Sequence, residues 1–488
     1  MNTLTKERFP WKAFIKSVMA IAVPVILQNG LTNLVSLLDN IMVGAVGTEQ
    51  MLAPLGELTV GAVGLCAQFS SLMFTGYWGF VGGGMLFFAQ YYGAKDDEGI
   101  NRSYGITLSF MMLVGFVFGL AAILFPETIM KVYTDKASLQ QLGVKYLRVV
   151  GFAYPLQVYA MACSALLRTT YKVRIPLYGG IASVLTNCAL NYCLIEGRFG
   201  FPALGIQGAA LATVCAAIVN VAVILIMAKV QKHPYLLRVS RHFRWNGDSL
   251  KAYLRKCFPI ILNEVAIGVG AMIMNIVLGR QSEAAIAGLA VFRTMEGFII
   301  GFFAGFSNAS SVLVGTEVGA GNLKLAYERA KRMVLLCDTF ILMGCLFLIA
   351  IHSPLLRAMS LSGESFNLCF GMLLIYSMVA LFRMGNWTQN DTYRSAGDAT
   401  TGTTLEIVFM YLLVVPSVCL TGLKFQAPFL VVFACCYIDE PIRFLLMQLH
   451  MYSGKWVRPV TPEGREALPA FMAERKQSRE KCRGQAAA

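Results

Sequence analysis

The sequence predicts an all-α polytopic membrane protein, with twelve transmembrane helices in two six-helix bundles related by a pseudo-twofold axis. Three observations predict this fold: an apolar composition, long runs without charge, and an internal repeat. Of the 488 residues, 57% are apolar and 14% are charged, whereas soluble domains carry about 25% charged residues. The mean hydropathy is +0.62. We therefore expect most of the chain to lie within lipid.

Long apolar runs predict transmembrane helices. Residues 103–125 and 205–228 contain no charged residue, and each run exceeds the roughly 20 residues that a helix needs to cross a hydrocarbon core. In lipid the backbone must satisfy its own hydrogen bonds, so runs of this length without strand alternation favour helices. The twelve predicted spans are residues 16–39, 51–91, 103–125, 139–168, 175–195, 204–228, 251–279, 284–318, 327–350, 364–392, 401–421 and 426–449.

The distribution of basic residues predicts that both termini are cytoplasmic. The formal net charge is +14, but the lysines and arginines are spread over the short connections and form no single patch that would bind nucleic acid. With the N-terminus inside, the inner connections carry most of them, including residues 229–256, while outer connections carry single ones such as Lys131 and Arg280. We expect a monomeric, multi-pass protein of the bacterial cell (plasma or inner) membrane, in contact with the lipid bilayer and without a nucleic-acid partner.

Motifs of several enzyme classes are absent from the sequence, so we expect no enzymatic activity. There is no Gly-x-x-x-x-Gly-Lys-Ser/Thr phosphate loop, no His-Glu-x-x-His and no Gly-x-Ser-x-Gly. The thirteen cysteines are scattered through apolar runs without metal-ligand spacing, which is typical of packing residues. We expect no cofactor, and no metal other than Na⁺ as a possible coupling ion.

The two halves of the chain resemble each other. Residues 24–28 (PVILQ) match residues 259–263 (PIILN), and residues 167–169 near the end of the fourth span match residues 393–395 near the end of the tenth. Six spans per half is an even number, so both halves enter the membrane from the same side and the repeat is parallel. Two such bundles can rock against each other, which is a simple route to alternating access. The predicted parts are a cytoplasmic segment at 1–15, a first lobe at 16–230, a cytoplasmic linker at 231–250, a second lobe at 251–450 and a basic cytoplasmic tail at 451–488.

Polar residues in the first lobe suggest an ion site. Asp39 lies late in the first span, and Asn187 and Asn191 are four residues apart in the fifth span, on one helical face. With the hydroxyl of Thr213, they would supply the hard oxygen ligands that Na⁺ accepts, and the carboxyl could take up H⁺ instead. Two alternatives remain: Asp39 could lie at the membrane interface, and the amides could hold neighbouring helices together.

The second lobe also carries ionisable residues inside its spans. Glu264 lies five residues past Pro259 in the seventh span, which favours a role in a central cavity. Arg293 and Glu296, three apart in the eighth span, could neutralise each other. The residues that we expect to line a substrate cavity are Glu264, Gln68, Gln28 and Asn263.

Five residues are candidates for a gate or for conformational change. Pro24 and Pro259 lie at matching places in the two halves, and each frees a backbone carbonyl and permits a kink. Arg394, Asp398 and Glu406 flank the turn between the tenth and eleventh spans. They could form a cytoplasmic gate lock or an ordinary interfacial cluster.

An ordered set of motifs resembles the multidrug and toxic compound extrusion (MATE) family over roughly residues 24–458. The motifs are Pro24 followed by Asp39-Asn40-Ile41-Met42-Val43-Gly44, Ala89-Gln90-Tyr91-Tyr92-Gly93-Ala94, residues 190–195, residues 202–213, Arg394-Ser395-Ala396-Gly397-Asp398 and Ser453-Gly454-Lys455-Trp456. The resemblance implies a V-shaped pair of six-helix lobes that exports bulky, often cationic compounds in exchange for Na⁺ or H⁺. It also implies a first-lobe ion site at Asp39, Asn187, Asn191 and Thr213.

Three positions depart from the family's pattern. Tyr171-Lys172 stands where many relatives have Gly-Asp, Ile267 where some have glutamate, and Arg383 where some have aspartate. The resemblance therefore does not carry cation coupling over to the second lobe.

We expect a secondary active antiporter that exports amphipathic, cationic small molecules. One alternative is a flippase for a lipid-linked oligosaccharide, which would need several lysines and arginines in its cavity to meet pyrophosphate. A second is a membrane receptor or scaffold without transport, which would have no reason to keep Asp39, Asn187 and Asn191 in lipid at their energetic cost.

Overall fold

A computed structural model describes residues 9–44, 53–359 and 362–486. Side chains are described for these residues except 35–44, 53–57, 196, 239, 358, 478–479 and 481–486. The described part of the chain is helical, with an isolated bridge between Gly397 and Val457 as its one β-type pairing.

The first lobe contains six transmembrane elements. They are α1 (Trp11–Gly44), α2 (Ala53–Gly93), α3 (Asp97–Leu124), the pair α5 (Ala137–Val150) and α6 (Ala153–Thr169), α7 (Arg174–Glu196) and α8 (Ile206–Val230). The short elements α4 (Pro126–Tyr133) and η1 (Arg198–Gly200) lie between them, and α9 (Val239–His242) lies in the connection to the second lobe.

The second lobe also contains six transmembrane elements. They are α10 (Gly247–Leu278), α11 (Glu283–Gly319), α12 (Leu323–Ala358), α13 (Gly363–Ser395), a run made of α14 (Thr401–Phe409), η2 (Met410–Val414), α15 (Val415–Cys419) and η3 (Leu420–Lys424), and the pair α16 (Phe429–Cys435) and α17 (Glu440–Ser453). A further helix, α18 (Pro462–Ala486), follows the last span.

Two of the predicted spans are interrupted. In the described residues, nine helices are long and apolar enough to cross a membrane, and α5 with α6 makes a tenth span that bends by 51°, whereas α7 and the pair α16 and α17 fall short of that length or apolarity. The span expected at 426–449 is divided at residues 436–439, where Asp439 and Glu440 precede Pro441. Proline lacks the N–H that would continue the helix, and both carboxylates pair with Arg443 one turn later.

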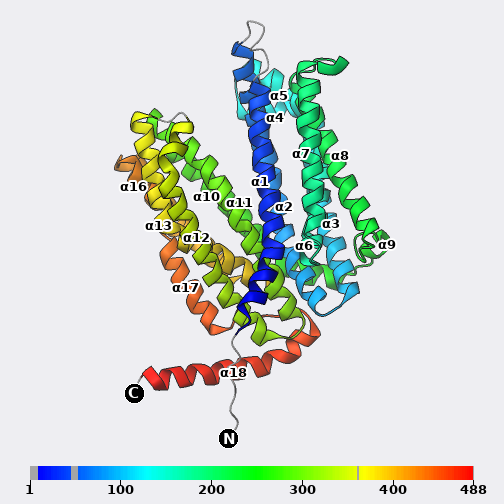
Figure 1. The fold of residues 1–488 in the computed structure, drawn as a ribbon, viewed down its shortest axis with the longest axis vertical. Coiled ribbons are helices and arrows are strands. Elements are labelled where there is room, and N and C mark those ends of the chain that lie inside the picture. The colour runs from blue at the N-terminus through cyan, green and yellow to red at the C-terminus, as the bar shows by residue number, and fades with distance from the viewer. Residues whose placement is uncertain (1–8, 45–52, 360–361, 487–488) are drawn as a thin grey trace.

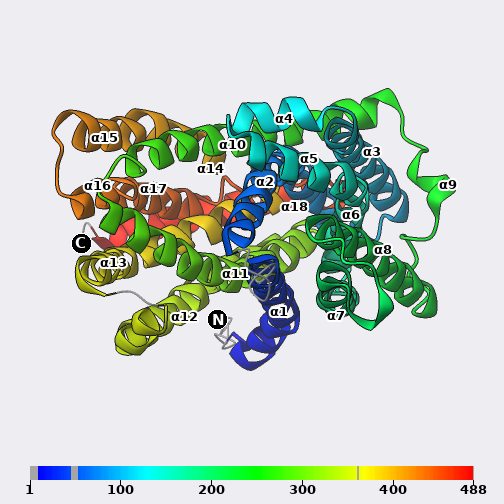
Figure 2. The same ribbon diagram turned by 90° about the horizontal axis from the view of Figure 1, so that it is seen from above.

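The two lobes diverge from one end of the molecule, which we call the base and define by the start of α1 and by α18 (Figure 1). Seen from above, α1, α2, α10 and α11 lie between the two groups of helices (Figure 2). In agreement with that view, α1 packs on α11, and α2 packs on α10 and α11. The lobes therefore meet along these four helices.

Glycines allow the lobes to approach closely at the base. A Cβ atom on Gly93 of α2 would overlap the carbonyl of Thr316 on α11, and one on Gly319 would overlap the carbonyl of Gln90. Gly93 ends α2 and Gly319 ends α11, so the C-terminal ends of these two helices face each other across the lobe interface.

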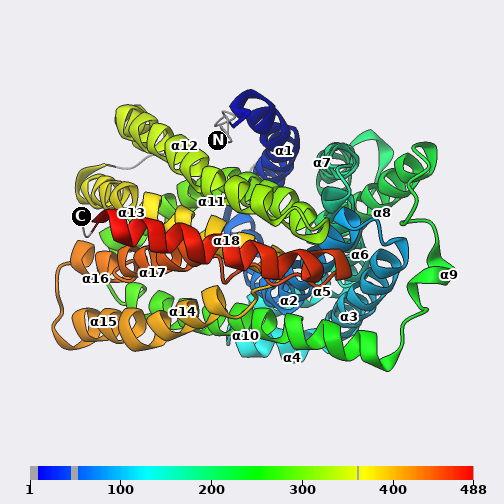
Figure 3. The same cartoon turned by 90° about the horizontal axis from the view of Figure 1, so that it is seen from below.

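The C-terminal segment joins both lobes at the base, where α18 crosses the molecule (Figure 3). The backbone N–H of Val460 donates to Oε1 of Gln90 in the first lobe (2.8 Å), and the Thr461 hydroxyl donates to the carbonyl of Gly319 in the second (2.8 Å). Further along, Glu474 of α18 pairs with Lys324 of α12 (2.7 Å). The predicted tail is thus a packed helix.

Candidate functional site

A cavity of about 440 Å³ lies where the lobes meet. Its walls come from α2 and α6 of the first lobe and from α10, α11, α13, α14, η2 and α17 of the second. Trp78 and Trp387 contribute aromatic surface, while the rest of the lining contains an unusual number of charged side chains for a site inside a membrane protein.

Arg394 stands between two carboxylates on the cavity wall. Its Nη1 atom lies 3.3 Å from Oε1 of Glu264 on α10 and 3.8 Å from Oδ1 of Asp391, one turn earlier on α13. The Ser307 hydroxyl of α11 donates to Asp391. Arg394 occupies the last turn of α13, where a cation is favoured by the helix dipole.

Arg443 of α17 stands among three carboxylates. Its guanidinium lies 3.6 Å from Oε1 of Glu406, 3.3 Å from Oδ2 of Asp439 and 2.8 Å from Oε2 of Glu440. Within the described residues, the five cavity carboxylates around Arg394 and Arg443 thus have these two arginines within ion-pair distance, while Arg168, Arg293 and Arg383 line other parts of the same cavity.

Amide side chains complete this network. Asn263 of α10 and Asn390 of α13 both donate to Oε2 of Glu406 (3.0 and 3.1 Å), and Asn386 donates to Oε2 of Glu440 (2.8 Å). Hydrogen bonds to a carboxylate favour its charged form. The amides therefore hold the carboxylates in place on the wall.

A third charged group holds one carboxylate between two arginines. Glu296, whose side chain is only 4% exposed, accepts from Arg293 at 2.7 Å and lies 3.4 Å from Arg383. The Tyr437 hydroxyl also donates to it (3.3 Å). The Arg293–Glu296 contact expected from their spacing is present, with Arg383 as a second partner from α13.

Arg168 is the cationic side chain of the first lobe on the cavity wall. It ends α6, is 5% exposed, and donates to Oε1 of Gln28 on α1 (2.8 Å) and to Oδ1 of Asn308 on α11 (3.4 Å). Its Nε atom has no hydrogen-bond partner among the described residues. Arg168 therefore links the two lobes through neutral amides.

The structure describes three of the four residues of the predicted first-lobe ion site. Asn191 donates from Nδ2 to Oδ1 of Asn187 (3.1 Å), and both are buried on α7, which packs against α1 and α8. The Thr213 hydroxyl donates to the carbonyl of Ala209 in its own helix (3.0 Å). The side chain of Asp39 lies outside the described residues, so the four-residue site stays a prediction.

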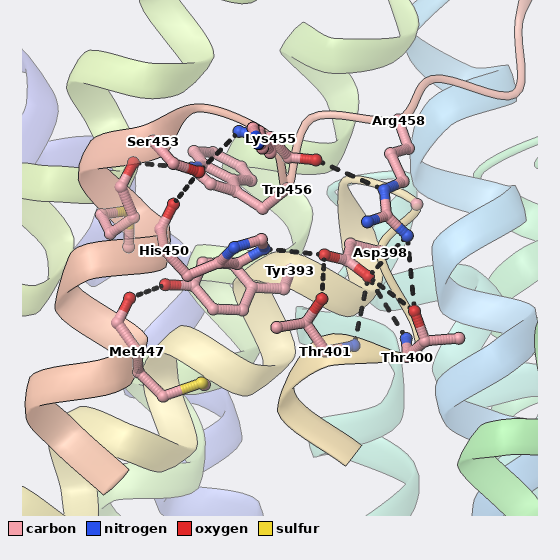
Figure 4. Close-up of polar contacts among 12 residues, drawn as sticks. Tyr393, Asp398, Thr400, Thr401, Met447, His450, Ser453, Lys455, Trp456 and Arg458 are labelled. Carbon is pink, nitrogen blue, oxygen red and sulfur yellow. Dashed lines mark hydrogen bonds and ion pairs between the residues drawn. The ribbon is translucent and has the colours of Figure 1, made fainter. Parts of the chain in front are cut away.

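Asp398 lies in the connection after α13, where it fixes the turn at the base (Figure 4). Its carboxylate accepts from the Thr401 hydroxyl (2.7 Å) and pairs with His450 of α17 (2.8 Å) and Arg458 (3.1 Å). Burial acts to raise the pKa of Asp398, but the hydrogen bonds from His450 and Thr401 and the charge of Arg458 outweigh it and hold the pKa at about 2. Asp398 is thus a permanently charged anchor near neutral pH.

Comparison with known sequences identifies the family of this chain. The sequence model of MatE matches residues 24–193 and 259–420, which covers both lobes. The chain belongs to the MatE family. Both halves of the internal repeat fall within the matched residues.

Curated relatives of this MatE chain are described as multidrug resistance proteins or as a transporter. "Probable multidrug resistance protein YoeA" of Bacillus subtilis is 26% identical over 65% of this chain and 67% of its own length. "Uncharacterized transporter YisQ" of the same organism is 22% identical over 84% of this chain and 90% of its own length. The family is one of non-enzymatic multidrug efflux transporters.

Solved structures show the same fold. One, described as the "outward-facing conformation of a multidrug resistance MATE family transporter", matches with a TM-score of 0.77 at 17% identity, over 90% of this chain and 96% of that one. A transporter from Pyrococcus furiosus, whose description notes the "reverse polarity of binding pocket", matches with a TM-score of 0.78 at 17% identity over the same shares. The two-lobe, twelve-helix architecture is therefore that of the MatE transporters.

Only some of the residues predicted to line the cavity do so in the structure. Glu264 and Asn263 line the cavity of this MatE chain. Gln28 lies behind the wall, where it accepts from Arg168, and Gln68 is exposed on α2 and is not among the lining residues.

The predicted gate residues fall into three settings. Arg394 and Glu406 lie on the cavity wall, and Asp398 lies at the base. Pro24 and Pro259 lie within continuous helices, α1 and α10, and Pro24 is buried.

Sequence reasoning missed several members of the charged network. They are Asp391, Asp439, Glu440, Arg443, Asn386 and Asn390. Two signals were present in the sequence. Asn386 and Asn390 are four residues apart, as Asn187 and Asn191 are, and the last span carries two acidic residues three and four positions before an arginine.

Proposed function

We propose that this MatE chain is a secondary active antiporter, without enzymatic activity or a cofactor, that exports amphipathic, cationic small molecules in exchange for Na⁺ or H⁺. The observation that supports it is the excess of carboxylates over arginines around Arg394 and Arg443 on the cavity wall. Uncompensated negative charge in a site shielded from water is costly. A proton, Na⁺ or a cationic substrate would supply the missing positive charge.

Competition for that charge offers a mechanism of exchange. In one state of the transporter, a cationic substrate binds at the carboxylates around Arg394 and Arg443 and compensates their negative charge. When the substrate leaves, Na⁺ or H⁺ from outside the cell binds the same carboxylates and compensates their charge. Substrate and ion thus occupy this site in turn. The lobes meet at the base and diverge away from it (Figure 1), and rocking them about their shared helices would move the cavity's opening from one side of the membrane to the other.

We place a second ion site in the first lobe, at Asp39, Asn187, Asn191 and Thr213. The buried amide pair lies on α7, a helix that packs against α1, which carries Asp39. We also place the base and both termini in the cytoplasm of a bacterial cell, since the basic connections lie on that side. The chain would act as a monomer, because the cavity is built within one copy.

The flippase alternative is less well supported by the cavity. Five arginines line it, but four of them lie within 4.0 Å of a carboxylate: Arg293, Arg383, Arg394 and Arg443. A pyrophosphate would have to displace those carboxylates.

Transport by purified protein in liposomes tests the proposal. An imposed Na⁺ or H⁺ gradient should drive uptake of a fluorescent cationic dye, and Asp39→Asn and Glu264→Gln should each reduce that uptake at least tenfold while the protein stays monodisperse. Glu127→Gln, which changes an exposed carboxylate paired with Arg148, serves as the control. Uptake that ignores both gradients would sink antiport, and full activity of Asp39→Asn would sink the first-lobe site.

A further inference from the structure

Arg168 differs from the other arginines on the cavity wall in its partners. Arg293, Arg383, Arg394 and Arg443 each lie within 4.0 Å of at least one carboxylate oxygen. Arg168 bonds instead to the neutral amide oxygens of Gln28 and Asn308, and no described carboxylate lies within ion-pair distance. It is the cavity's one cation of this kind among the described residues.

The guanidinium of Arg168 has unused hydrogen-bonding capacity. Its side chain is almost fully buried, and Nε has no acceptor among the described residues. Gln28 and Asn308 hold the Nη atoms from two different lobes, which fixes the plane of the group. A fixed, buried guanidinium with an unpaired Nε–H suits an oxyanion, because hydrogen bonds from arginine to carboxylates and phosphates are charge-assisted and strong.

Charge of opposite sign lies on the far wall of the same cavity. Five carboxylates surround Arg394 and Arg443, on α10, α13, α14 and the start of α17. The cavity thus carries a positive charge on its first-lobe wall and a group of carboxylates on its second-lobe wall. Trp78 and Trp387 add aromatic surface to the lining.

We infer that the preferred substrates are amphoteric: each carries an anionic group that binds Arg168, together with a cationic part that faces the carboxylate wall. This inference rests on the proposed transport function and narrows its substrate class, because a cation that also carries an anionic group binds more tightly than a cation without one. A substrate bound at Arg168 would also touch the contact from Arg168 to Asn308, which joins the lobes. Binding of the anionic group would then alter a hydrogen bond that joins the two lobes.

Equilibrium binding of two matched dyes tests the inference. Rhodamine B carries a free carboxylate beside its cationic ring system, and its methyl ester keeps the cation but lacks the carboxylate. Fluorescence anisotropy with the purified full chain in detergent, without any gradient, should show binding of rhodamine B at least tenfold tighter than of the ester. Arg168→Gln should remove this preference by weakening rhodamine B alone, while Arg168→Lys should retain part of it.

The matched control is Arg148→Gln, an exposed arginine on α5, which should keep the wild-type preference. Equal binding of the two dyes by wild type, tighter binding of the ester, binding of neither, or a preference that survives in Arg168→Gln would each overturn the inference. If Arg168→Gln does not fold, the wild-type ratio and Arg168→Lys decide. Because no gradient is used, this result is separate from the liposome test: a chain that binds the dyes selectively but ignores both gradients would contradict antiport and leave the anion site standing.

Discussion

The side chain of Gln90 in the first lobe donates a hydrogen bond to the backbone carbonyl of Ser395 in the second, with 2.8 Å between Nε2 and the oxygen. Gln90 is fully buried, and its Oε1 atom accepts from the N–H of Val460 in the C-terminal segment. The Gln90 amide thus satisfies the carbonyl of Ser395 and the N–H of Val460, both of which lie more than 300 residues away in the sequence. It is the most direct polar link between the lobes at the base.

Gln90→Leu should shift the transporter toward the conformation that is open at the base. The change leaves a buried carbonyl and a buried N–H without partners, at a cost of about 1–3 kcal/mol each, and opening the base would let water satisfy both. Cys257 is a native reporter, because it is buried on α10 against Gly83 of α2. Labelling of Cys257 by a maleimide, followed by peptide mass spectrometry, should be faster in Gln90→Leu than in wild type. Unchanged labelling would show that this hydrogen bond does not hold the base closed.

Arg394→Gln should destabilise the protein more than Glu264→Gln does. Removing Arg394 leaves Glu264 and Asp391 without their shared cation, and breaking a buried pair in this way typically costs about 3–5 kcal/mol. Removing the charge of Glu264 still leaves Arg394 with Asp391. Thermal unfolding in detergent should therefore show a clearly lower Tm for Arg394→Gln. The opposite order would mean that Arg394 is not the shared cation of this pair.

Asp398→Asn should lower stability at neutral pH, and this effect should fade in acid. The pKa of Asp398 is about 2 in the folded protein instead of its ordinary 3.8, so the carboxylate contributes about 2 kcal/mol above pH 4. That contribution is lost as the pH falls from about 4 to 2, and the Tm difference between wild type and variant should shrink over the same interval. Asp135→Asn, in the connection between α4 and α5, is the control. A Tm difference that stayed the same from pH 6 down to pH 2 would contradict the anchor role.

Pro24→Ala should slow transport several-fold and leave ion affinity nearly unchanged. Pro24 lies inside α1 where that helix crosses α11, since a Cβ on Gly305 would crowd Ile26 and the carbonyl of Ala22. Proline removes a hydrogen bond of the helix ladder and eases bending at this crossing. Transport rates in liposomes and equilibrium ion binding by calorimetry would separate the two quantities. A rate equal to that of wild type would remove Pro24 from the conformational step.

The helices could be predicted from the sequence because the apolar composition of each run depends on the lipid around it and not on the helices it contacts. The lipid environment excludes charge over about 20 residues whatever the helix packs against, so the spans were recoverable one at a time. Breaks inside a span were harder to predict: the division before Pro441 depends on Asp439 and Glu440 turning toward Arg443.

The candidate site could be predicted only in fragments. Glu264 was expected in the cavity and Arg394 and Glu406 at a gate, yet the structure brings all three to one wall. Spacing along a helix shows which residues share a face, but not which faces of different helices meet. The contact of Glu264 with Arg394 spans 130 residues and depends on how α10 packs near α13.

The position of the C-terminal segment has a consequence for how the protein is made. The N–H of Val460 and the hydroxyl of Thr461 supply the donors for Gln90 and Gly319, which lie on α2 and α11. A ribosome releases α2 and α11 long before it reaches residue 460, and N-terminal parts of a chain generally fold first during synthesis. The contact between the lobes at the base is thus completed only after residues 460 and 461 have left the ribosome. A polypeptide that terminates after α17 would contain all twelve spans and still lack these two hydrogen bonds.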